Sequence, residues 1–249
     1  MARAVWDQLA DAYDSRHGDD GNKWHRMLVE PAVLRMLPLS QGLRVLDLCC
    51  GSGMLARRLD SLGATVTGAD GSDEFLSRAR LRSADRIRWV LVDATDEEAI
   101  AALGTFDAVV STMAVMDLPD IAPLFRGVQR LLHTGGPFVV VTAHPAFNHP
   151  DVVFVTEDGE ACDGDAWQRR TIRMSRYLKP YEQEVRGVPG QPVTQRYFHR
   201  PLSSILAAAF GAGFVLDALE EPSFREPSDG RYDARPEIPP VLAIRLRAH

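Results

Sequence analysis

The sequence predicts an α/β protein built on a mainly parallel sheet, and three observations support this fold class. Short apolar segments alternate with helical segments from residue 43 to residue 143. The first apolar segment ends in a glycine turn, Gly51-Ser52-Gly53, that opens a helix, and the second ends in an acidic residue, Asp70. Alternating strands and helices imply βαβ units with right-handed crossovers and a parallel sheet.

Two helices are expected before this alternation begins. Apolar residues from Trp6 to Tyr13 follow the i, i+3, i+4, i+7 spacing of one helix face. The polar stretch 14–22 is expected to break this helix. A second helix carries apolar residues from 24 to 37 and stops at Pro38, because proline cannot continue a helix.

The alternating core supplies five strands. The apolar run 43–48 predicts the first of them as a buried strand. The same reasoning predicts, in chain order, a helix over 54–62, a strand over 64–69, a helix over 72–83, a strand over 87–92, a helix over 97–103, a strand over 106–111, a helix over 121–132 and a strand over 137–143.

The region 144–200 interrupts the alternation, since it is rich in proline, glycine and charged residues. We expect strands over 170–177 and 193–198 and an insertion that lies over the top edge of the sheet. Alternation resumes with a helix after Pro201 and strands over 214–219 and 241–247. With no repeat or linker, 1–249 is predicted to be a single domain: a helical cap (1–40), a core (41–143), a lid insertion (144–200) and the end of the core (201–249).

Composition limits the classes of function. The chain of 249 residues is 45% hydrophobic and carries a net charge of −6, which argues against nucleic acid as a partner, since such domains usually carry a basic surface. Its three cysteines are too few and uneven for a disulfide framework. No apolar stretch approaches membrane-spanning length, and residues 1–7 lack the apolar core of a signal peptide. We therefore expect a cytoplasmic protein without membrane contact.

The glycine turn is the strongest signal for a ligand site. Gly51 and Gly53 allow close approach of the backbone to a ligand, and the helix that follows offers free N–H groups to a polar or anionic group. Asp70, about twenty residues downstream, is placed to accept the hydroxyls of a ribose. Asp93, after the third strand, can accept a hydrogen bond from an adenine amino group. The alternative for Asp70, Ser72 and Asp93 is that each only caps a helix.

At these residues the chain resembles the class I S-adenosylmethionine-dependent methyltransferases, in particular small-molecule members near the ubiquinone and menaquinone C-methyltransferases. The resemblance rests on three motifs, Asp47 to Gly53, Ala69-Asp70-Gly71-Ser72 and Val92-Asp93-Ala94, and on the segments 6–14 and 106–120. It implies a three-layer Rossmann-like fold whose seven-stranded, mostly parallel sheet has one antiparallel strand from the final hairpin. It also implies S-adenosylmethionine as cofactor, S-adenosylhomocysteine as product, and these cofactor residues: Tyr13, Asp47, Cys49, Gly51, Gly53, Asp70, Gly71, Ser72, Asp93, Ala94, Thr112 and Met113. The family often has glycine where this chain has Cys49.

The methyl group of a sulfonium is already activated, so the protein has to hold an acceptor in line with it and exclude water. A hydroxyl or acidic carbon acceptor also needs a general base, whereas a carboxylate or free amine does not. Histidine is the natural base, and the candidates are His144, His25 and His199. His17 ranks lower because it lies in the polar stretch after the first helix, and Asp117 could orient an acceptor. O-methylation is favoured, with N- or C-methylation open.

The insertion adds charge and aromatic surface. Its arginines could attract an acidic acceptor, although pairing with nearby carboxylates on a solvated face is favoured. Its aromatic residues could line an acceptor pocket or form a small core. No His/Cys cluster has metal-ligand spacing, so no metal is predicted, and a homodimer that exchanges the insertion stays open. The residues in question are Arg169, Arg170, Arg173, Arg176, Lys179, Arg186, Arg196 and Arg200, with Trp167, Tyr177, Tyr181, Tyr197 and Phe198.

Two other functions fit parts of the pattern. A nicotinamide-dependent oxidoreductase would share the glycine turn and Asp70, with Ala56 in place of the third glycine. A protein that binds S-adenosylmethionine without transferring its methyl group, such as a partner subunit or a cyclase, would share the whole fold, because fold does not fix function.

Overall fold

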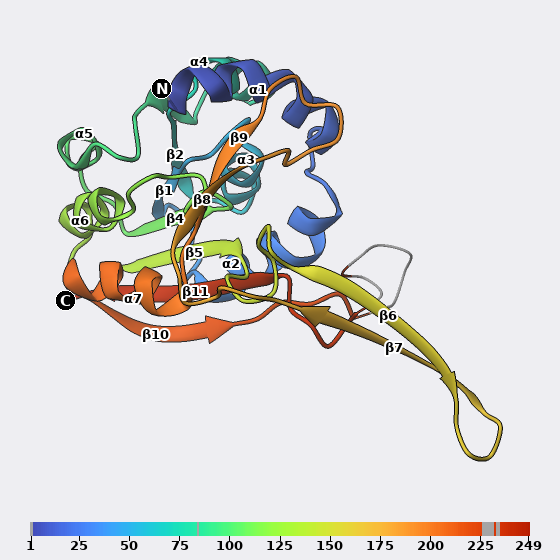
Figure 1. The fold of residues 1–249 in the computed structure, drawn as a ribbon. Helices are drawn as coiled ribbons and strands as arrows, with labels where there is room; N and C mark the ends of the chain where they lie inside the picture. The colour runs from blue at the N-terminus through green and yellow to red at the C-terminus, as the bar shows by residue number, and fades with distance from the viewer. Residues whose placement is uncertain (1, 84, 226–231, 233–234) are drawn as a thin grey trace.

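The computed structural model describes residues 2–83, 85–225, 232 and 235–249. A seven-stranded sheet in the order β10-β11-β5-β4-β1-β2-β3 forms its centre (Figure 1). In the described chain, β11 runs antiparallel to both β5 and β10, while the other neighbours pair in parallel. The predicted fold class is therefore confirmed. The strands are β1 (Arg44–Leu48), β2 (Thr65–Asp70), β3 (Arg88–Leu91), β4 (Ala108–Thr112), β5 (Pro137–Ala143), β10 (Phe214–Glu220) and β11 (Val241–Ala248).

Alternation of side chains along the strands divides the core into two layers. Leu46 and Leu48 of β1 join one apolar cluster, and Val45 joins the other on the opposite face. The first cluster contains side chains of α5 (Glu97–Ala101), α6 (Ala122–Leu131) and α7 (Leu202–Gly211). The second contains side chains of a π-helical turn, η1 (His25–Val29), and of α2 (Glu30–Met36) and α3 (Met54–Ser61). Helices thus cover both faces, as a parallel sheet requires.

The first helix is longer than predicted. α1 (Ala2–His17) continues four residues past Tyr13, because Asp14 pairs with Arg78 and Arg82 of α4 (Asp73–Arg82). It ends where Gly18 adopts a left-handed φ of 61°. The prediction of a break over 14–22 was therefore wrong over its first turn. Because the helix continues, Tyr13 and His17 lie one turn apart on the same face.

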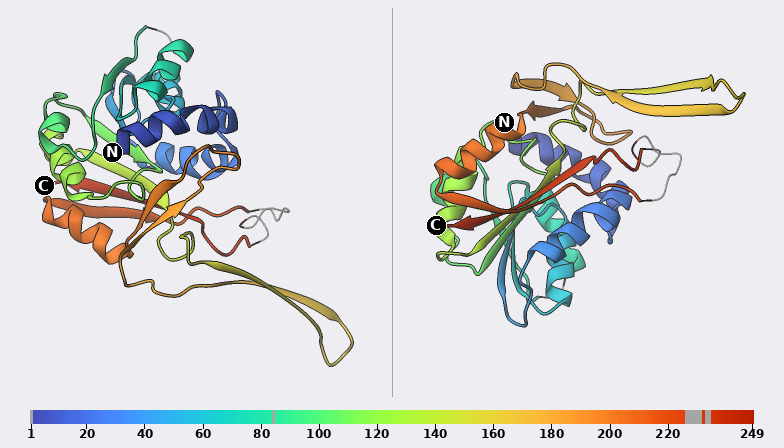
Figure 2. Two further views of the ribbon diagram at one scale, coloured as in Figure 1. Left: turned by 45° about the horizontal axis from the view of Figure 1, so that its top comes forward. Right: turned by 90° about the horizontal axis from the view of Figure 1, so that it is seen from below.

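The insertion contains two hairpins. β6 (Val153–Glu160) pairs with β7 (Ala166–Arg173), and β8 (Tyr181–Val185) pairs with β9 (Gln195–His199). The first hairpin projects away from the body, whereas the second crosses it close to α1 (Figure 2). The strands expected over 170–177 and 193–198 correspond to β7 and β9, shifted by a few residues. Their partners were missed because β6 and β8 are mostly exposed and lack an apolar period.

Candidate active site

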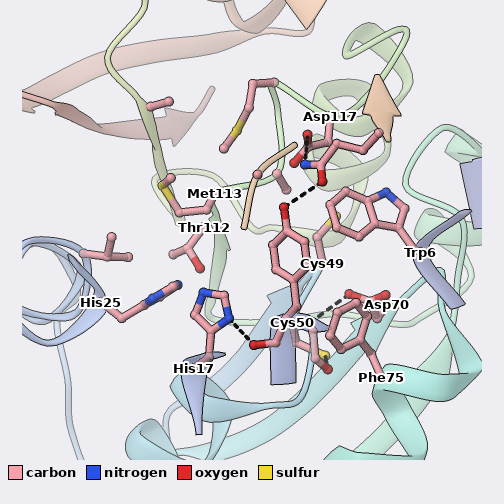
Figure 3. A pocket seen from close by; sticks show the side chains of 18 of the residues that line it. Trp6, His17, His25, Cys49, Cys50, Asp70, Phe75, Thr112, Met113 and Asp117 are labelled. Atoms are coloured by element: carbon pink, nitrogen blue, oxygen red, sulfur yellow. Dashed lines mark hydrogen bonds between the residues drawn. The ribbon is translucent and has the colours of Figure 1, made fainter. Parts of the chain in front are cut away.

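A cavity of about 570 Å³ opens at the carboxyl ends of β1 to β4, the edge where parallel α/β sheets bind ligands. Its walls come from several parts of the chain (Figure 3). They include Trp6, Tyr13, His17, Asn22, Trp24 and His25 from the N-terminal region; Cys49, Cys50, Gly51, Asp70, Gly71, Asp93 and Ala94 after β1 to β3; Thr112, Met113, Met116 and Asp117 after β4; and Val185, Gly187, Gln195 and Tyr197 from the β8–β9 hairpin.

The turn after β1 is shaped by left-handed backbone, with φ of 63° at Cys49 and 55° at Gly51. The N–H groups of Cys49 and Cys50 both donate to the Ala69 carbonyl, at 2.7 and 3.1 Å, and so hold the turn against β2. A Cβ added to Gly51 would meet no atom within 4 Å, so this residue faces open space in the cavity. Gly51 is therefore the point where a ligand can lie against the backbone.

Gly53 has a different role from Gly51. Its φ is 75°, and an added Cβ would lie 2.3 Å from the ring of Trp89. Gly53 does not line the cavity. Left-handed backbone and the packed indole explain why this position needs glycine.

Asp70 lines the cavity and organises the turn. Its Oδ2 accepts the Gly51 N–H at 2.8 Å and its Oδ1 accepts the Ser72 N–H at 2.9 Å. A carboxylate oxygen can accept more than one hydrogen bond, so Asp70 can take two ligand hydroxyls while it holds Gly51 in place. Ser72 itself is buried away from the cavity, where its hydroxyl accepts the Phe75 N–H at 3.2 Å and caps α4.

Asp93 and Ala94 line the neighbouring wall, beyond β3. Asp93 Oδ1 accepts both the N–H and the hydroxyl of Thr95, at 2.8 and 2.7 Å. Its Oδ2 has no contact of this kind among the described residues and is available to an amino group. Gly71, between the two acidic positions, also lines the cavity.

Thr112 and Met113 continue β4 into the cavity wall. Met113 has a left-handed φ of 54°, and its N–H donates to the Val141 carbonyl at 2.7 Å. Cys49 and Met113 are thus two non-glycine residues with strained backbone on the same cavity. Such strain persists where the surrounding structure enforces it, and it concentrates at functional sites.

His17 and His25 face each other in the cavity beside Thr112 and Met113 (Figure 3), with ring centroids 4.9 Å apart. His17 Nδ1 lies 2.6 Å from the Tyr13 carbonyl. His25 Nδ1 lies 3.0 Å from Asn22 Oδ1, which also accepts the His25 backbone N–H at 3.2 Å and so must be the oxygen of that amide. Because both partners can only accept, each Nδ1 carries the proton, and Nε2 of each neutral ring is free to accept one.

Burial keeps these imidazoles neutral. It lowers the pKa of His25 to about 4, with repulsion from His17 as the second cause. Burial also lowers the pKa of His17, opposed by the Tyr13 carbonyl and by Asp14. A neutral imidazole with a free Nε2 is the state that a general base requires.

Asp117 lines the cavity at the start of the loop after β4. Gln195 of β9 donates from Nε2 to Asp117 Oδ1 at 3.3 Å, and its Oε1 accepts the hydroxyl of Tyr13 at 2.7 Å. Burial raises the pKa of the Asp117 carboxyl to about 7, and the Gln195 amide opposes the shift. This chain of contacts joins α1, the β8–β9 hairpin and the core around the cavity.

Asp47 is fully buried in β1 and does not line the cavity. Neither carboxyl oxygen has a hydrogen-bond partner; the Ala56 amide favours the charged form, but its geometry falls short of a hydrogen bond. Burial, with the charge of Asp70 as the second cause, raises the pKa of Asp47 to about 7. The structure therefore places this predicted cofactor residue behind the glycine turn.

Asp47 makes stability depend on pH. Since its pKa in the folded protein is raised, the fold retains the proton more tightly than the unfolded chain does, and stability is lost as pH rises from about 4 to about 7. A pKa shift of this size means that the charged, buried carboxyl destabilises the fold by about 4 kcal/mol. Asparagine at this position removes that cost, but its own unpaired buried amide costs about 1–3 kcal/mol. We expect Asp47→Asn to raise the free energy of unfolding by about 1–3 kcal/mol at pH 8, with a smaller gain at pH 5.

Urea unfolding at the two pH values measures this effect, with the exposed Asp73→Asn as a control. Some pH dependence should remain in the Asp47 variant, because Asp117 acts in the same direction. Equal slopes of stability against pH in wild type and Asp47→Asn would contradict the assignment.

The other two predicted bases lie outside the cavity. His144 Nε2 is 2.8 Å from Glu221 Oε1, and its Nδ1 accepts the Ala146 N–H at 3.1 Å, so both ring nitrogens are engaged. His199 Nε2 donates to the Tyr177 carbonyl at 2.7 Å, and its ring stacks on Tyr181. The structure brings only His25 of the three to the cavity.

The cavity wall is acidic and apolar. Among the described residues that line it there is no lysine or arginine, while Asp14, Asp70, Asp93 and Asp117 are present. Arginines of the insertion pair elsewhere: Arg176 with Asp151 and Arg196 with Glu182. In the described ranges no three histidine, cysteine or acidic side chains are grouped to hold a metal ion, and none of the helices there is long and apolar enough to span a membrane.

Several cavity residues were ranked low or missed by sequence reasoning. The polar stretch 14–22 predicts a turn at His17 and so argues against a role for it, although its i+4 spacing from Tyr13 is a usable signal of a continuing helix. Asn22 gave no signal, because its role is to orient His25. Gln195 reaches the cavity only because the β8–β9 hairpin folds back over it, and no local pattern reports that path. Tyr197, named among the aromatic residues that could line an acceptor pocket, reaches the cavity by the same path.

The fold and the site define a class: an α/β protein with a nucleoside-sized cavity, a glycine turn and two acidic positions at the strand ends. A methyltransferase domain model matches residues 45–136. The crystal structure of an S-adenosylmethionine-dependent methyltransferase from Mesorhizobium loti is 32% identical, covers 87% of this chain and 96% of that one, and superimposes with a TM-score of 0.65. The chain therefore belongs to the class I S-adenosylmethionine-dependent methyltransferases, which confirms the resemblance and the predicted cofactor.

Curated relatives match over shorter stretches. The 2-phytyl-1,4-naphtoquinone methyltransferase of Synechococcus elongatus is 34% identical over 153 residues, which cover 58% of this chain and 64% of that protein. The ubiquinone biosynthesis O-methyltransferase of Xanthomonas oryzae pv. oryzae is 35% identical over 103 residues, covering 41% and 43%. The matched part of the chain thus spans less than two thirds of these relatives.

Proposed function

We propose that the protein transfers the methyl group of S-adenosylmethionine to a hydroxyl group of a small-molecule acceptor. One observation carries this proposal: a single cavity joins the acidic positions and glycine turn suited to a nucleoside with a pair of neutral imidazoles whose Nε2 atoms are free. When bound, the cofactor supplies an activated methyl group. The chain has to fix both partners, exclude water and accept one proton.

The residues at the strand ends fit the cofactor. Asp70 has capacity for ribose hydroxyls, Asp93 has a free oxygen for the adenine amino group, and Gly51 leaves the space that a Cβ would fill. Tyr13 closes the cavity from α1 and is itself held by Gln195. Of the other predicted cofactor residues, Cys49, Gly71, Ala94, Thr112 and Met113 line the same wall, whereas Asp47, Gly53 and Ser72 support it from behind.

The remaining wall favours an uncharged, flat acceptor. Trp24, Tyr197 and Tyr232 supply aromatic surface, and no cation among the described lining residues faces the cavity to hold an acidic group. The names of the two curated relatives specify quinone-type compounds, which supports a phenolic or hydroxyquinone acceptor here. O-methylation is favoured over N- or C-methylation because His25 offers the proton acceptor that a hydroxyl needs.

We infer that the protein acts on a small molecule and not on nucleic acid, since the cavity lining carries no basic side chain among the described residues. The cytoplasmic location expected from the sequence stays a prediction. A homodimer stays a prediction.

Methyl transfer can be tested with deuterium-labelled S-adenosylmethionine and a panel of phenols, hydroxyquinones and aromatic amines. We expect S-adenosylhomocysteine to form together with a product that carries one labelled methyl on oxygen. Labelled methyl on nitrogen would overturn the preference for a hydroxyl. Tight cofactor binding with no S-adenosylhomocysteine formed from any panel member or cell extract would instead favour the non-methylating alternative.

A further inference from the structure

Four carboxylates line the cavity, and three of them already have strong partners. Asp14 is paired with Arg82 and lies 3.6 Å from Arg78. Asp70 accepts two backbone N–H groups, and Asp93 accepts the N–H and hydroxyl of Thr95. Asp117 differs from these, because among the described residues its carboxylate receives one hydrogen bond, of 3.3 Å, from a neutral amide.

Among the described residues, the groups whose pKa responds to the charge of Asp117 carry no positive charge. They are Tyr13 of α1, Cys49 after β1 and Tyr197 of β9; each is neutral at physiological pH, and burial raises its pKa further. Arg200, which follows β9, points its guanidinium at the main-chain carbonyls of Leu118 and Pro119 instead. A half-buried carboxylate in such a site lacks a counter-charge.

We propose that Asp117 is a charge-selective binding residue that recognises the positive charge of the cofactor's sulfonium and so distinguishes S-adenosylmethionine from S-adenosylhomocysteine. The inference rests on the proposed function. A cationic amine on the acceptor would offer the same chemistry, but the position of Asp117 favours the cofactor. It lies near Cys49 of the glycine turn and is linked through Gln195 to Tyr13, both on the cofactor wall (Figure 3).

This assignment predicts how affinity changes during turnover. In the transfer the carbon–sulfur bond breaks, a carbon–oxygen bond forms, the electron pair stays on sulfur, and the hydroxyl proton passes to the base. The sulfur thereby loses its charge, and Asp117 loses the interaction. The product should bind more weakly than the substrate by the strength of that charge pair, which would favour release.

Isothermal titration of S-adenosylmethionine and S-adenosylhomocysteine at pH 8 tests the proposal, with wild type, Asp117→Asn and Asp120→Asn. Asp120 lies three residues further on, outside the cavity, and controls for net charge. We expect Asp117→Asn to weaken S-adenosylmethionine binding about tenfold, a moderate value for one partly screened charge pair. It should leave S-adenosylhomocysteine binding within about twofold, and Asp120→Asn should change neither.

A pH series adds an independent readout. Because the pKa of Asp117 is raised to about 7, the carboxylate is charged above that pH and neutral below it. The preference of wild type for S-adenosylmethionine should therefore shrink several-fold from pH 8 to pH 6, and the preference of Asp117→Asn should stay flat. Subtracting the pH dependence of the preference in Asp117→Asn from that in wild type removes any contribution from titration of the ligands themselves.

The remaining outcomes separate this inference from the proposed function. Equal weakening of both ligands would show that Asp117 is structural or binds the amino group that both ligands share, and either result would overturn the proposal. Unchanged affinity for both ligands, with weaker binding of an amine acceptor, would assign the carboxylate to the acceptor and also overturn it. If neither ligand binds the wild type, the proposed function itself fails.

Discussion

Replacing Asp70 with alanine should lower the affinity for S-adenosylmethionine about a hundredfold or more. Two hydrogen bonds from hydroxyls to a carboxylate are each worth about 1.5–3 kcal/mol, and the side chain also fixes the Gly51 and Ser72 N–H groups. Both losses act on the same wall of the cavity. Isothermal titration of the variant measures the effect, with thermal unfolding to confirm that the fold persists.

Binding of two nucleosides to wild type and to Asp70→Asn separates the loss of hydrogen bonds to the ribose from the loss of hydrogen bonds to the backbone of the turn. Asp70→Asn keeps one acceptor oxygen for the backbone but cannot accept equally from two hydroxyls. Adenosine should bind wild type more tightly than 2′-deoxyadenosine, and this difference should shrink in Asp70→Asn. If 2′-deoxyadenosine binds more weakly than adenosine by the same factor in both proteins, Asp70 shapes the turn without contacting the sugar.

Replacing His25 with alanine should lower kcat by about 10²–10⁴-fold for a hydroxyl acceptor, the usual contribution of a general base. The affinity for S-adenosylmethionine should change little, because His25 lies beside His17 and not on the wall formed by Asp70 and Asp93. Steady-state kinetics with the acceptor identified by the labelled-methyl panel measure kcat, and titration measures affinity. His133→Ala, an exposed histidine outside the cavity, is the matched control.

The pH profile distinguishes a base from a structural residue. Since burial lowers the pKa of His25 to about 4, the imidazole stays neutral and able to accept a proton down to about pH 5. At saturating S-adenosylmethionine, where a change in cofactor affinity does not affect the rate, wild-type kcat should therefore stay flat between pH 5.5 and 8, a range in which a histidine with an ordinary pKa becomes protonated. A fall in wild-type kcat near pH 6.5 under these conditions, or a His25 variant with normal kcat, would remove His25 from the mechanism; His17→Ala would then be the next test.

Much of the fold was accessible from the sequence because its elements carry local signals. The strands from β1 to β5 are short apolar runs, and the helices between them have an apolar face, so periodicity located them to within a few residues. Strand β6, and its pairing with β7, could not be found in this way, since both strands are exposed and carry charged residues on both faces. Its course depends on where the chain leaves β5, which no local pattern encodes.

The residues of the candidate site show the same difference between positions with a local sequence signal and positions that depend on the tertiary path of the chain. Gly51, Asp70 and Asp93 follow predicted strands directly, so topology alone brings them together at one edge. His17 depends on α1 continuing into a polar stretch, Asn22 and His25 depend on the turn that follows α1, and Gln195 depends on a hairpin folding back from residue 181. Among the three predicted bases, sequence could not single out His25, because only the side-chain partners in the folded protein show that both ring nitrogens of His144 are engaged while Nε2 of His25 is free.

The central claim is that the cavity above β1 to β4 binds S-adenosylmethionine, and equilibrium titration of this ligand into the wild-type protein tests it most directly. We predict one site per chain, with affinity lost in Asp70→Ala and no displacement by millimolar NAD⁺. Absence of binding, or displacement by NAD⁺, would contradict the account and favour a nicotinamide site in the same fold.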